Sequence, residues 1–138
     1  FELEFLTGHP TRTTADVLAA VDELRGRGPE VVVVTSVVGS DAADDVMRMI
    51  GVGPEGAWQV ETPVLDRKFT GSGDLTTAMF LAHWLRSRDV GAALGVTASV
   101  VYSVLEATTR AGHPELRLVD AQSDIVDPRF VFQAEPVG

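Results

Sequence analysis

Four consecutive valines, Val31 to Val34, constrain the fold of this chain more strongly than any other feature. Valine is β-branched, and a continuous apolar run is typical of a strand that is buried on both faces, as in a parallel sheet. Helical and strand patterns alternate around this run, and that mixed order favours a layered α/β fold with a mainly parallel central sheet. The 138 residues suit one domain, since domains usually contain about 100–150 residues.

Capping residues and helical spacing indicate three helices. Thr13 is a good N-cap, and the apolar residues after it recur at helical spacing as far as Arg27. Asp74 opens the second helix, and the third runs from about 90 to 110. Because the third falls short of the ~20 apolar residues that a spanning helix needs, we expect a buried helix and no membrane segment. The other expected elements are a helical turn over 2–6, strands over 46–52, 57–60, 116–119 and 130–132, a polar loop over 39–45 and an irregular stretch over 63–70.

The charge balance narrows the class of partner. Asp and Glu total 20 against 11 Lys and Arg, which gives a formal net charge of -9. An acidic chain lacks the basic surface that binding to a phosphate backbone requires, so nucleic acid is not an expected partner. There is no Cys, which excludes disulfides and thiolate metal sites and is compatible with a cytoplasmic location. None of the three His residues has ligand spacing with another, so no zinc site is predicted.

The stretch Gly71-Ser72-Gly73-Asp74 carries the strongest chemical signal. Two glycines permit a tight turn and a close approach of backbone amides to a ligand, and the helix that follows favours an anion at its N-terminus. Amides for a phosphoryl group beside one carboxylate, Asp74, make a phosphoryl-transfer site. The competing interpretation is a glycine turn with Asp74 in the first turn of a helix, because short glycine motifs often occur by chance. The stretch is neither a P-loop nor a dinucleotide fingerprint, since the spacing of both is different.

Three further residues, Thr35, Ser36 and Glu2, could serve phosphoryl transfer. Thr35 and Ser36 follow the valine run, and ligands of open α/β sheets bind beyond the carboxyl ends of strands. Capping of a turn explains the two hydroxyls equally well. Glu2 could hold a metal-bound water, although an isolated surface Glu is more often only solvated.

Taken together, these segments resemble the pyridoxal kinase family of the ribokinase-like superfamily. Residues 1–8 look like the segment after the family's Thr-Pro-Asn motif, 33–36 look like the strand end that meets nucleotide phosphates, and 71–75 are similar to the anion-hole motif. The tail over 115–128 resembles the pyridoxal kinase C-terminus in particular. The resemblance covers nearly the whole chain in the expected order, and it implies a ribokinase-like layered fold, C-terminal half only.

The resemblance also implies an activity. The family transfers the γ-phosphoryl group of ATP to the 5′-hydroxymethyl group of pyridoxal, pyridoxine or pyridoxamine, which gives pyridoxal 5′-phosphate and salvages vitamin B6. Asp74 would contact the substrate and act as general base, and the amides of Gly71, Ser72 and Gly73 would form the anion hole. The nucleotide would contact Thr35, Ser36, Phe69 and Thr70, and Glu2 would hold Mg²⁺ indirectly through water. A monovalent cation stays open as a further cofactor, and a homodimer is implied for the full-length form.

The chain departs from the family at its beginning. It starts at Phe1, so residues 1–138 would form the C-terminal nucleotide-binding and catalytic part of a kinase domain whose N-terminal half is absent. We therefore predict no turnover by this piece alone, and self-association through an unpaired sheet edge. Three alternatives stay open. They are a hydroxymethylpyrimidine kinase, whose branch usually has Cys where Asp74 stands, a sugar kinase, which would lack the tail over 121–128, and a non-catalytic nucleotide-binding fragment.

Overall fold

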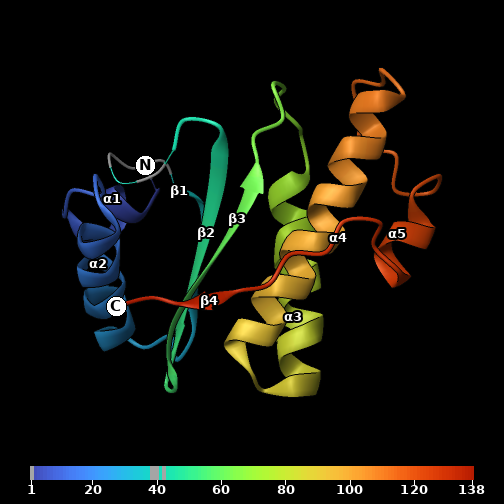
Figure 1. The fold of residues 1–138 in the computed structure, drawn as a ribbon. Coiled ribbons are helices and arrows are strands. Elements are labelled where there is room, and N and C mark those ends of the chain that lie inside the picture. Colours follow the sequence, from blue (N-terminus) through green and yellow to red (C-terminus); the bar gives the residue numbers. More distant parts are fainter. Residues whose placement is uncertain (1, 38–40, 42) are drawn as a thin grey trace.

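The computed structural model describes residues 2–37, 41 and 43–138, and it places a four-stranded sheet between two layers of helices (Figure 1). Helices α1 (Glu2–Thr7) and α2 (Thr14–Gly26) cover one face of the sheet. Helices α3 (Ser72–Ser87) and α4 (Val90–Arg110) lie on the other side. The predicted α/β layering is therefore confirmed.

The sheet is antiparallel throughout the described part of the chain. Its order is β1 (Val32–Val37), β2 (Val46–Gly53), β3 (Gly56–Pro63) and β4 (Glu135–Pro136). The prediction of a mainly parallel sheet is wrong for these strands. A parallel pair needs a crossover of about a dozen residues or more, but residues 38–45 alone join β1 to β2, and a tight hairpin joins β2 to β3 with Gly53 paired to Gly56.

The valine run forms a strand, but it is not buried on both faces. Val32 to Val34 are half-buried, because β1 stands at the edge of the sheet and pairs with β2 on one side. The fully buried strand is β2, where every residue from Arg48 to Gly53 is buried. The pattern of consecutive valines predicted the strand correctly and its position in the sheet wrongly, since position depends on which strands come beside it.

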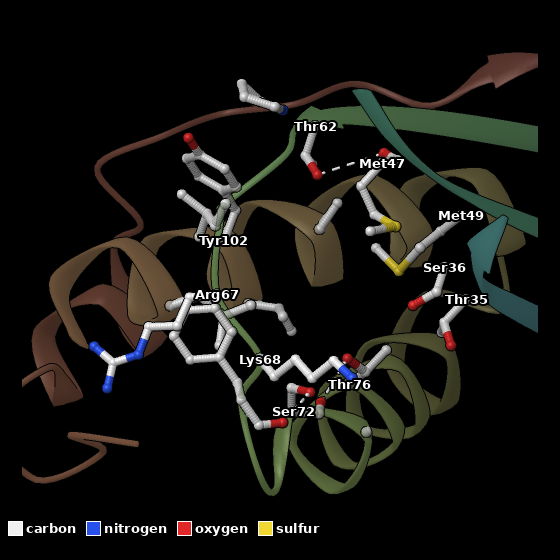
Figure 2. A pocket seen from close by; sticks show the side chains of 17 residues that line it. Thr35, Ser36, Met47, Met49, Thr62, Arg67, Lys68, Ser72, Thr76 and Tyr102 are labelled. Atoms are coloured by element: carbon white, nitrogen blue, oxygen red, sulfur yellow. Dashed lines mark hydrogen bonds between the residues drawn. The ribbon is translucent and has the colours of Figure 1, made fainter. Parts of the chain in front are cut away.

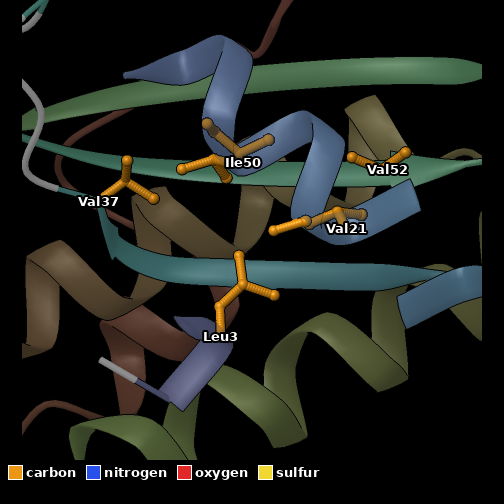
Figure 3. Packing of buried hydrophobic residues seen from close by; sticks show 7 residues of the cluster. Leu3, Val21, Val37, Ile50 and Val52 are labelled. Carbon is orange, nitrogen blue, oxygen red and sulfur yellow. The ribbon is translucent and has the colours of Figure 1, made fainter. Parts of the chain in front are cut away.

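Side chains of β2 alternate between two apolar clusters. Ile50 and Val52 pack with Leu3, Val21 and Val37 beneath α1 and α2 (Figure 3). Met49 points to the opposite face and packs with residues of β3 and α4. The period of two along the strand therefore joins both helical layers to one sheet.

The three predicted helices are confirmed as α2, α3 and α4. Thr13 caps α2 through a capping box with Asp16, in which the Thr13 side chain accepts from the Asp16 amide and the Asp16 carboxylate accepts from the Thr13 amide. Asp89 caps α4 by accepting a hydrogen bond from the amide of Ala92 at 2.8 Å. By length and composition α4 could cross a membrane, but 67% of its most apolar window is buried inside the fold, as expected of a core helix.

The C-terminal segment differs from prediction. A short helix, α5 (Gln122–Val126), was not anticipated. Neither 116–119 nor 130–132 is a strand. Their backbone amides bond to α4 instead of a neighbouring strand: Arg117 donates to the Thr108 hydroxyl at 3.1 Å, and Phe132 donates to the Ser99 hydroxyl at 2.8 Å. The predicted loop over 39–45 lies partly outside the described residues.

Candidate functional site

A cavity of about 410 Å³ lies where the sheet meets the beginning of α3 (Figure 2). Its walls come from β1, β2 and β3, from residues 65–69, and from the facing sides of α3 and α4. Segments that are far apart in the sequence therefore meet at one hollow, which makes it the candidate ligand site.

The start of α3 forms the floor of this cavity. Gly71 has a φ of 87°, a left-handed conformation that glycine adopts readily, and as N-cap it provides no side-chain hydrogen bond. The first amides of a helix have no partner inside the helix, so those after Gly71 are available to an anion. The Ser72 hydroxyl donates to the Phe69 carbonyl at 3.1 Å, and the Thr76 hydroxyl donates to the Ser72 carbonyl at 2.8 Å. These bonds fix the turn that presents the amides.

The cavity is cationic although the chain is acidic. Lys68 and Arg67 are among the lining residues, and no described lining residue is Asp or Glu. Lys68 is the single lysine of the sequence, and Figure 2 shows its side chain extending toward Ser72 and Thr76. Arg67 has a structural role, because its guanidinium donates to the His113 carbonyl and lies 5.8 Å from the centre of the Phe69 ring. Among the described residues Lys68 has no hydrogen bond or ion pair, so its ammonium is the positive charge available to a ligand in the cavity.

Thr35 and Ser36 face this cavity from β1. The pairing of β1 with β2 shifts between Val34 and Val37, and Ser36 has a φ of 55°, which is uncommon for a residue with a side chain. Both hydroxyls are exposed, and both lie on the opposite side of the cavity from Tyr102 (Figure 2). The irregular strand thus directs two polar side chains at the hollow.

The structure brings together five of the predicted site residues. The cavity is lined by Thr35, Ser36, Phe69, Ser72 and Gly73. Thr70, Gly71 and Asp74 are neighbours of this set in the chain but are not in the lining. Asp74 is exposed in the first turn of α3, directly after Gly73.

Glu2 lies elsewhere. It is exposed on α1 and lines a second hollow of about 630 Å³, whose wall also includes Thr35 and Ser36. The two hydroxyl groups therefore stand between the cavity at α3 and the hollow at Glu2. Among the described residues no group of three His, Asp or Glu side chains is placed to hold a metal ion.

Several lining residues were not found from the sequence. They are Met47, Met49, Thr62, Pro63, Leu65, Arg67, Lys68, Thr76, Ala98, Val101, Tyr102 and Leu105. A single lysine three residues before Gly71, in a chain with a charge of -9, was a usable signal for Lys68. The methionines and Tyr102 had no such signal, because only the packing of β2 and α4 against α3 brings them to one place.

Comparison of the chain with models of protein families identifies the family to which it belongs. Residues 1–109 match the model of the pfkB family carbohydrate kinases. The chain belongs to the pfkB family. This places the glycine turn, α3 and most of α4 inside the matched region, and it confirms the kinase resemblance seen in the sequence.

Individual relatives within the pfkB family are similar over the whole chain. Pyridoxal kinase PdxY of Corynebacterium diphtheriae is 42% identical over 138 residues, which is 100% of this chain and 49% of the relative. The proteins of the same name from Leifsonia xyli and Rubrobacter xylanophilus are 43% and 44% identical and are covered to 49% and 48%. The chain thus spans about half the length of the relatives it matches.

Solved structures confirm the ribokinase-like fold. Pyridoxal kinase from Leishmania donovani, in complex with ADP and ginkgotoxin, superposes with a TM-score of 0.89 at 21% identity over 100% of this chain and 49% of that chain. A putative phosphomethylpyrimidine kinase from Bacteroides thetaiotaomicron superposes with a TM-score of 0.84 at 20% identity over 99% of this chain and 49% of its own. At this level of identity the likeness concerns the fold alone.

Proposed function

We propose that the complete protein carrying this chain is a pyridoxal kinase. It would transfer the γ-phosphoryl group of ATP to the 5′-hydroxymethyl group of pyridoxal, pyridoxine or pyridoxamine. The observation that carries the proposal is the cavity at the start of α3, beside Asp74, which is lined by Lys68 and by no Asp or Glu among the described residues. The relatives named pyridoxal kinase, at 42–44% identity over the chain, support this choice of substrate class.

The nucleotide would lie with its phosphates at the polar side of the cavity. Lys68, Thr35 and Ser36 line the cavity together with Ser72 and Gly73, whose backbone amides lie in the first turn of α3. Phosphoryl transfer needs little covalent chemistry from the protein, so positioning and stabilisation of charge account for most of the catalysis. Donors fixed on a strand and a helix start meet that need, because they do not have to reorganise during the reaction.

Asp74 would be the general base that accepts the proton of the attacking hydroxyl group. Asp74 is exposed and directly follows Gly73, a residue of the cavity lining, so its carboxylate would act on a hydroxyl group that approaches the γ-phosphoryl group from outside the cavity. A loose transition state lets the proton leave late, so a weak base is sufficient. The anion hole would consist of the amides of Gly71, Ser72 and Gly73, and Phe69 and Thr70 would contact the nucleotide from the preceding segment.

Mg²⁺ would lie between the phosphates and the hollow at Glu2. The side-chain oxygens that line that hollow include the Glu2 and Glu4 carboxylates and the hydroxyls of Thr35 and Ser36. This set fits Mg²⁺, which prefers oxygen, keeps several waters and is usually bound through one or two carboxylates together with substrate phosphates. Glu2 would act through a bound water, and the ion would supply neutralisation of phosphate charge. A monovalent cation stays a further option.

The organisation of the whole protein follows from the same proposal. Residues 1–138 would form the C-terminal nucleotide-binding and catalytic part of one kinase domain. Residues 1–138 alone would not phosphorylate pyridoxal, because the relatives are about twice as long and contain a second half that these residues lack. A homodimer, a cytoplasmic location and the absence of a nucleic-acid or membrane partner remain predictions.

A panel of primary alcohols tests the substrate class. The complete reading frame is incubated with ATP and Mg²⁺ and with pyridoxal, hydroxymethylpyrimidine or ribose in parallel, and the phosphorylated products are quantified by mass spectrometry. We expect pyridoxal 5′-phosphate as the main product. Phosphorylation of another alcohol while pyridoxal is untouched would keep the kinase assignment and overturn the vitamer assignment.

A further inference from the structure

Three aromatic rings meet behind one wall of the cavity. Tyr102 of α4 lines the cavity, and the rings of Phe130 and Phe132 contact it from the C-terminal segment. The ring centres are 5.0 Å and 5.2 Å from that of Tyr102, and the planes are inclined by 82° and 76°. Edge-to-face contacts of this kind are favourable and orient both partners. The position of the Tyr102 ring is thus determined by two residues outside the cavity lining.

Hydrogen bonds to α4 hold these two phenylalanines in place. The Phe130 amide donates to the Ser103 hydroxyl at 3.1 Å, and the Phe132 amide donates to the Ser99 hydroxyl at 2.8 Å. The two serines lie one helical turn apart, on either side of Tyr102 in the sequence. Gly95, one turn earlier, leaves room for the chain, since a Cβ there would lie 3.1 Å from the Phe132 carbonyl oxygen. Ser99, Ser103 and Gly95 of α4 therefore form a surface on which the backbone of this segment binds.

Both ends of the segment are also anchored. Arg129 donates to the two carboxylate oxygens of Asp124 at 2.8 Å and 3.1 Å, and this carboxylate is buried. At the other end, β4 pairs with β3 through Gln59 and Glu135. Because the segment is held at both ends and along its length, Phe130 and Phe132 have fixed positions, and their rings fix the orientation of the Tyr102 ring.

The cavity has a polar side and an apolar side, and Tyr102 lies on the apolar side. Lys68 and the hydroxyls of Thr35 and Ser36 are the polar side, and Tyr102 stands across the hollow from the two hydroxyls (Figure 2). Val101 and Leu105 extend the wall of Tyr102 with apolar surface. An anionic group bound at the polar side would therefore carry a flat, apolar group against Tyr102. A purine nucleoside triphosphate has both parts.

We propose that the Tyr102 ring packs against the purine base of the nucleotide, and that Phe130 and Phe132 are positioning residues that hold this ring in place. The proposal rests on the proposed function, because it takes the nucleotide to bind in this cavity. It goes further in assigning a binding role to the C-terminal segment, which has no residue in the cavity lining.

The chain offers a matched control in Val131. This residue lies between the two phenylalanines, and its side chain is 75% exposed, so it points away from Tyr102. Phe130→Leu and Phe132→Leu remove the aromatic contact and keep an apolar side chain, whereas Phe132→Tyr keeps the ring. Val131→Ala changes the same segment and leaves the three rings intact.

Binding of two ligands to the complete protein tests the proposal. Calorimetry measures ATP and inorganic tripolyphosphate, which has the phosphates and lacks the base. In each leucine variant we expect the Kd for ATP to rise about 3- to 10-fold, the range that the loss of one aromatic contact gives. The Kd for tripolyphosphate should stay within about twofold, and Val131→Ala and Phe132→Tyr should bind ATP like the wild type.

Each other outcome counts against one part of the account. Equal losses for ATP and tripolyphosphate, or a loss as large in Val131→Ala, would show a merely structural segment and overturn the inference. If the leucine variants do not fold, Tyr102→Leu compared with Tyr102→Phe repeats the comparison, and equal ATP binding by these two would overturn it as well. Wild-type protein that binds neither ligand would overturn the proposed function itself.

Discussion

At the scale of single residues, the account depends on where charge lies around the glycine turn. Lys68 is the one lysine in a chain with a net charge of -9, and it lines a cavity whose described lining residues include neither Asp nor Glu. The acidic surface elsewhere repels a nucleotide, so the cavity and the helix start have to provide the attraction. This makes Lys68 the residue whose charge should matter most for nucleotide affinity.

Removal of that charge gives a direct prediction. Lys68→Met keeps the length and apolar stem of the side chain, and we expect the Kd for ATP to rise about tenfold, the loss of one charge-assisted contact. Lys68→Arg should retain most of the affinity. Arg86→Met, which removes the same charge from an exposed position of α3, is the control and should leave the affinity unchanged. A loss of equal size in both methionine variants would contradict a specific role for Lys68.

A second residue-scale prediction concerns pH. Asp41 accepts from the Thr14 amide at 2.9 Å, and hydrogen bonds from the Thr14 side chain and amide, with the nearby Arg48 guanidinium, hold the pKa of its carboxyl below the ordinary value of 3.8. The ionised form is therefore favoured by folding, and its contribution is complete above pH 3.8 and disappears as the pH falls through the lower, folded value.

Asp41→Asn tests this contact by urea unfolding at pH 7 and at about pH 2. We expect the variant to be less stable than the wild type at pH 7, and the difference to vanish at the acidic end. Asp44→Asn, a neighbouring exposed carboxylate for which no contact to Thr14 exists among the described residues, is the control. A stability difference that is the same at both values would show that the charge of Asp41 is not involved.

At the scale of elements, the packing of α4 on β3 depends on one close approach. Gly91 lies against Trp58, and a Cβ at this position would come within 2.7 Å of the indole ring. Trp58 packs with Met49, Val60, Leu94 and Ala98 in the cluster that joins the sheet to α4. Because that cluster sets the distance between the sheet and α4, it also sets the width of the cavity between them.

Gly91→Ala should therefore destabilise the fold. Overpacking of a well-packed core costs about 1–3 kcal/mol, which outweighs the small gain in helix propensity from Gly to Ala. Gly26→Ala in α2 is the matched control, since a Cβ there meets nothing within 4 Å. Denaturant unfolding should show a lower free energy of unfolding than the wild type for Gly91→Ala, and an unchanged or slightly higher one for Gly26→Ala. Equal stabilities would contradict the close contact of α4 with Trp58.

The elements also show which features a sequence can predict. The helices over 14–26 and 90–110 were predictable because their signals are local: a capping residue at each start and apolar residues at helical spacing. The path of 130–132 was not, because its amides bond to hydroxyls of Ser99 and Ser103, some 27 to 33 residues away. The glycine turn was found for the same local reason as the helices, whereas Tyr102 reached the site only through tertiary packing.

At the scale of the whole molecule, β1 leaves one edge of the described sheet without a paired strand. A groove of about 470 Å³ is lined by Val31, which precedes β1, by Val33 of β1, and by Phe80, Leu81 and Trp84 of α3. Leu81 and Leu85 are each 50% exposed on that helix. An unpaired strand edge beside exposed apolar side chains promotes association.

The isolated 138-residue chain should therefore self-associate and bind an apolar dye. Light scattering at increasing concentration measures the first property and dye fluorescence the second. The same preparation should form no pyridoxal 5′-phosphate, while the complete reading frame should form it. A concentration-independent monomer that does not bind the dye would contradict the open edge.

Comparison of Asp74→Asn with the wild type in the complete reading frame measures whether Asp74 serves a phosphoryl transfer from ATP to pyridoxal. The account predicts a fall in kcat for pyridoxal 5′-phosphate formation of about 10²- to 10⁴-fold, the usual contribution of a general base, with a Kd for ATP within about twofold of the wild type because Asp74 is not in the cavity lining. An asparagine variant with wild-type kcat would contradict it.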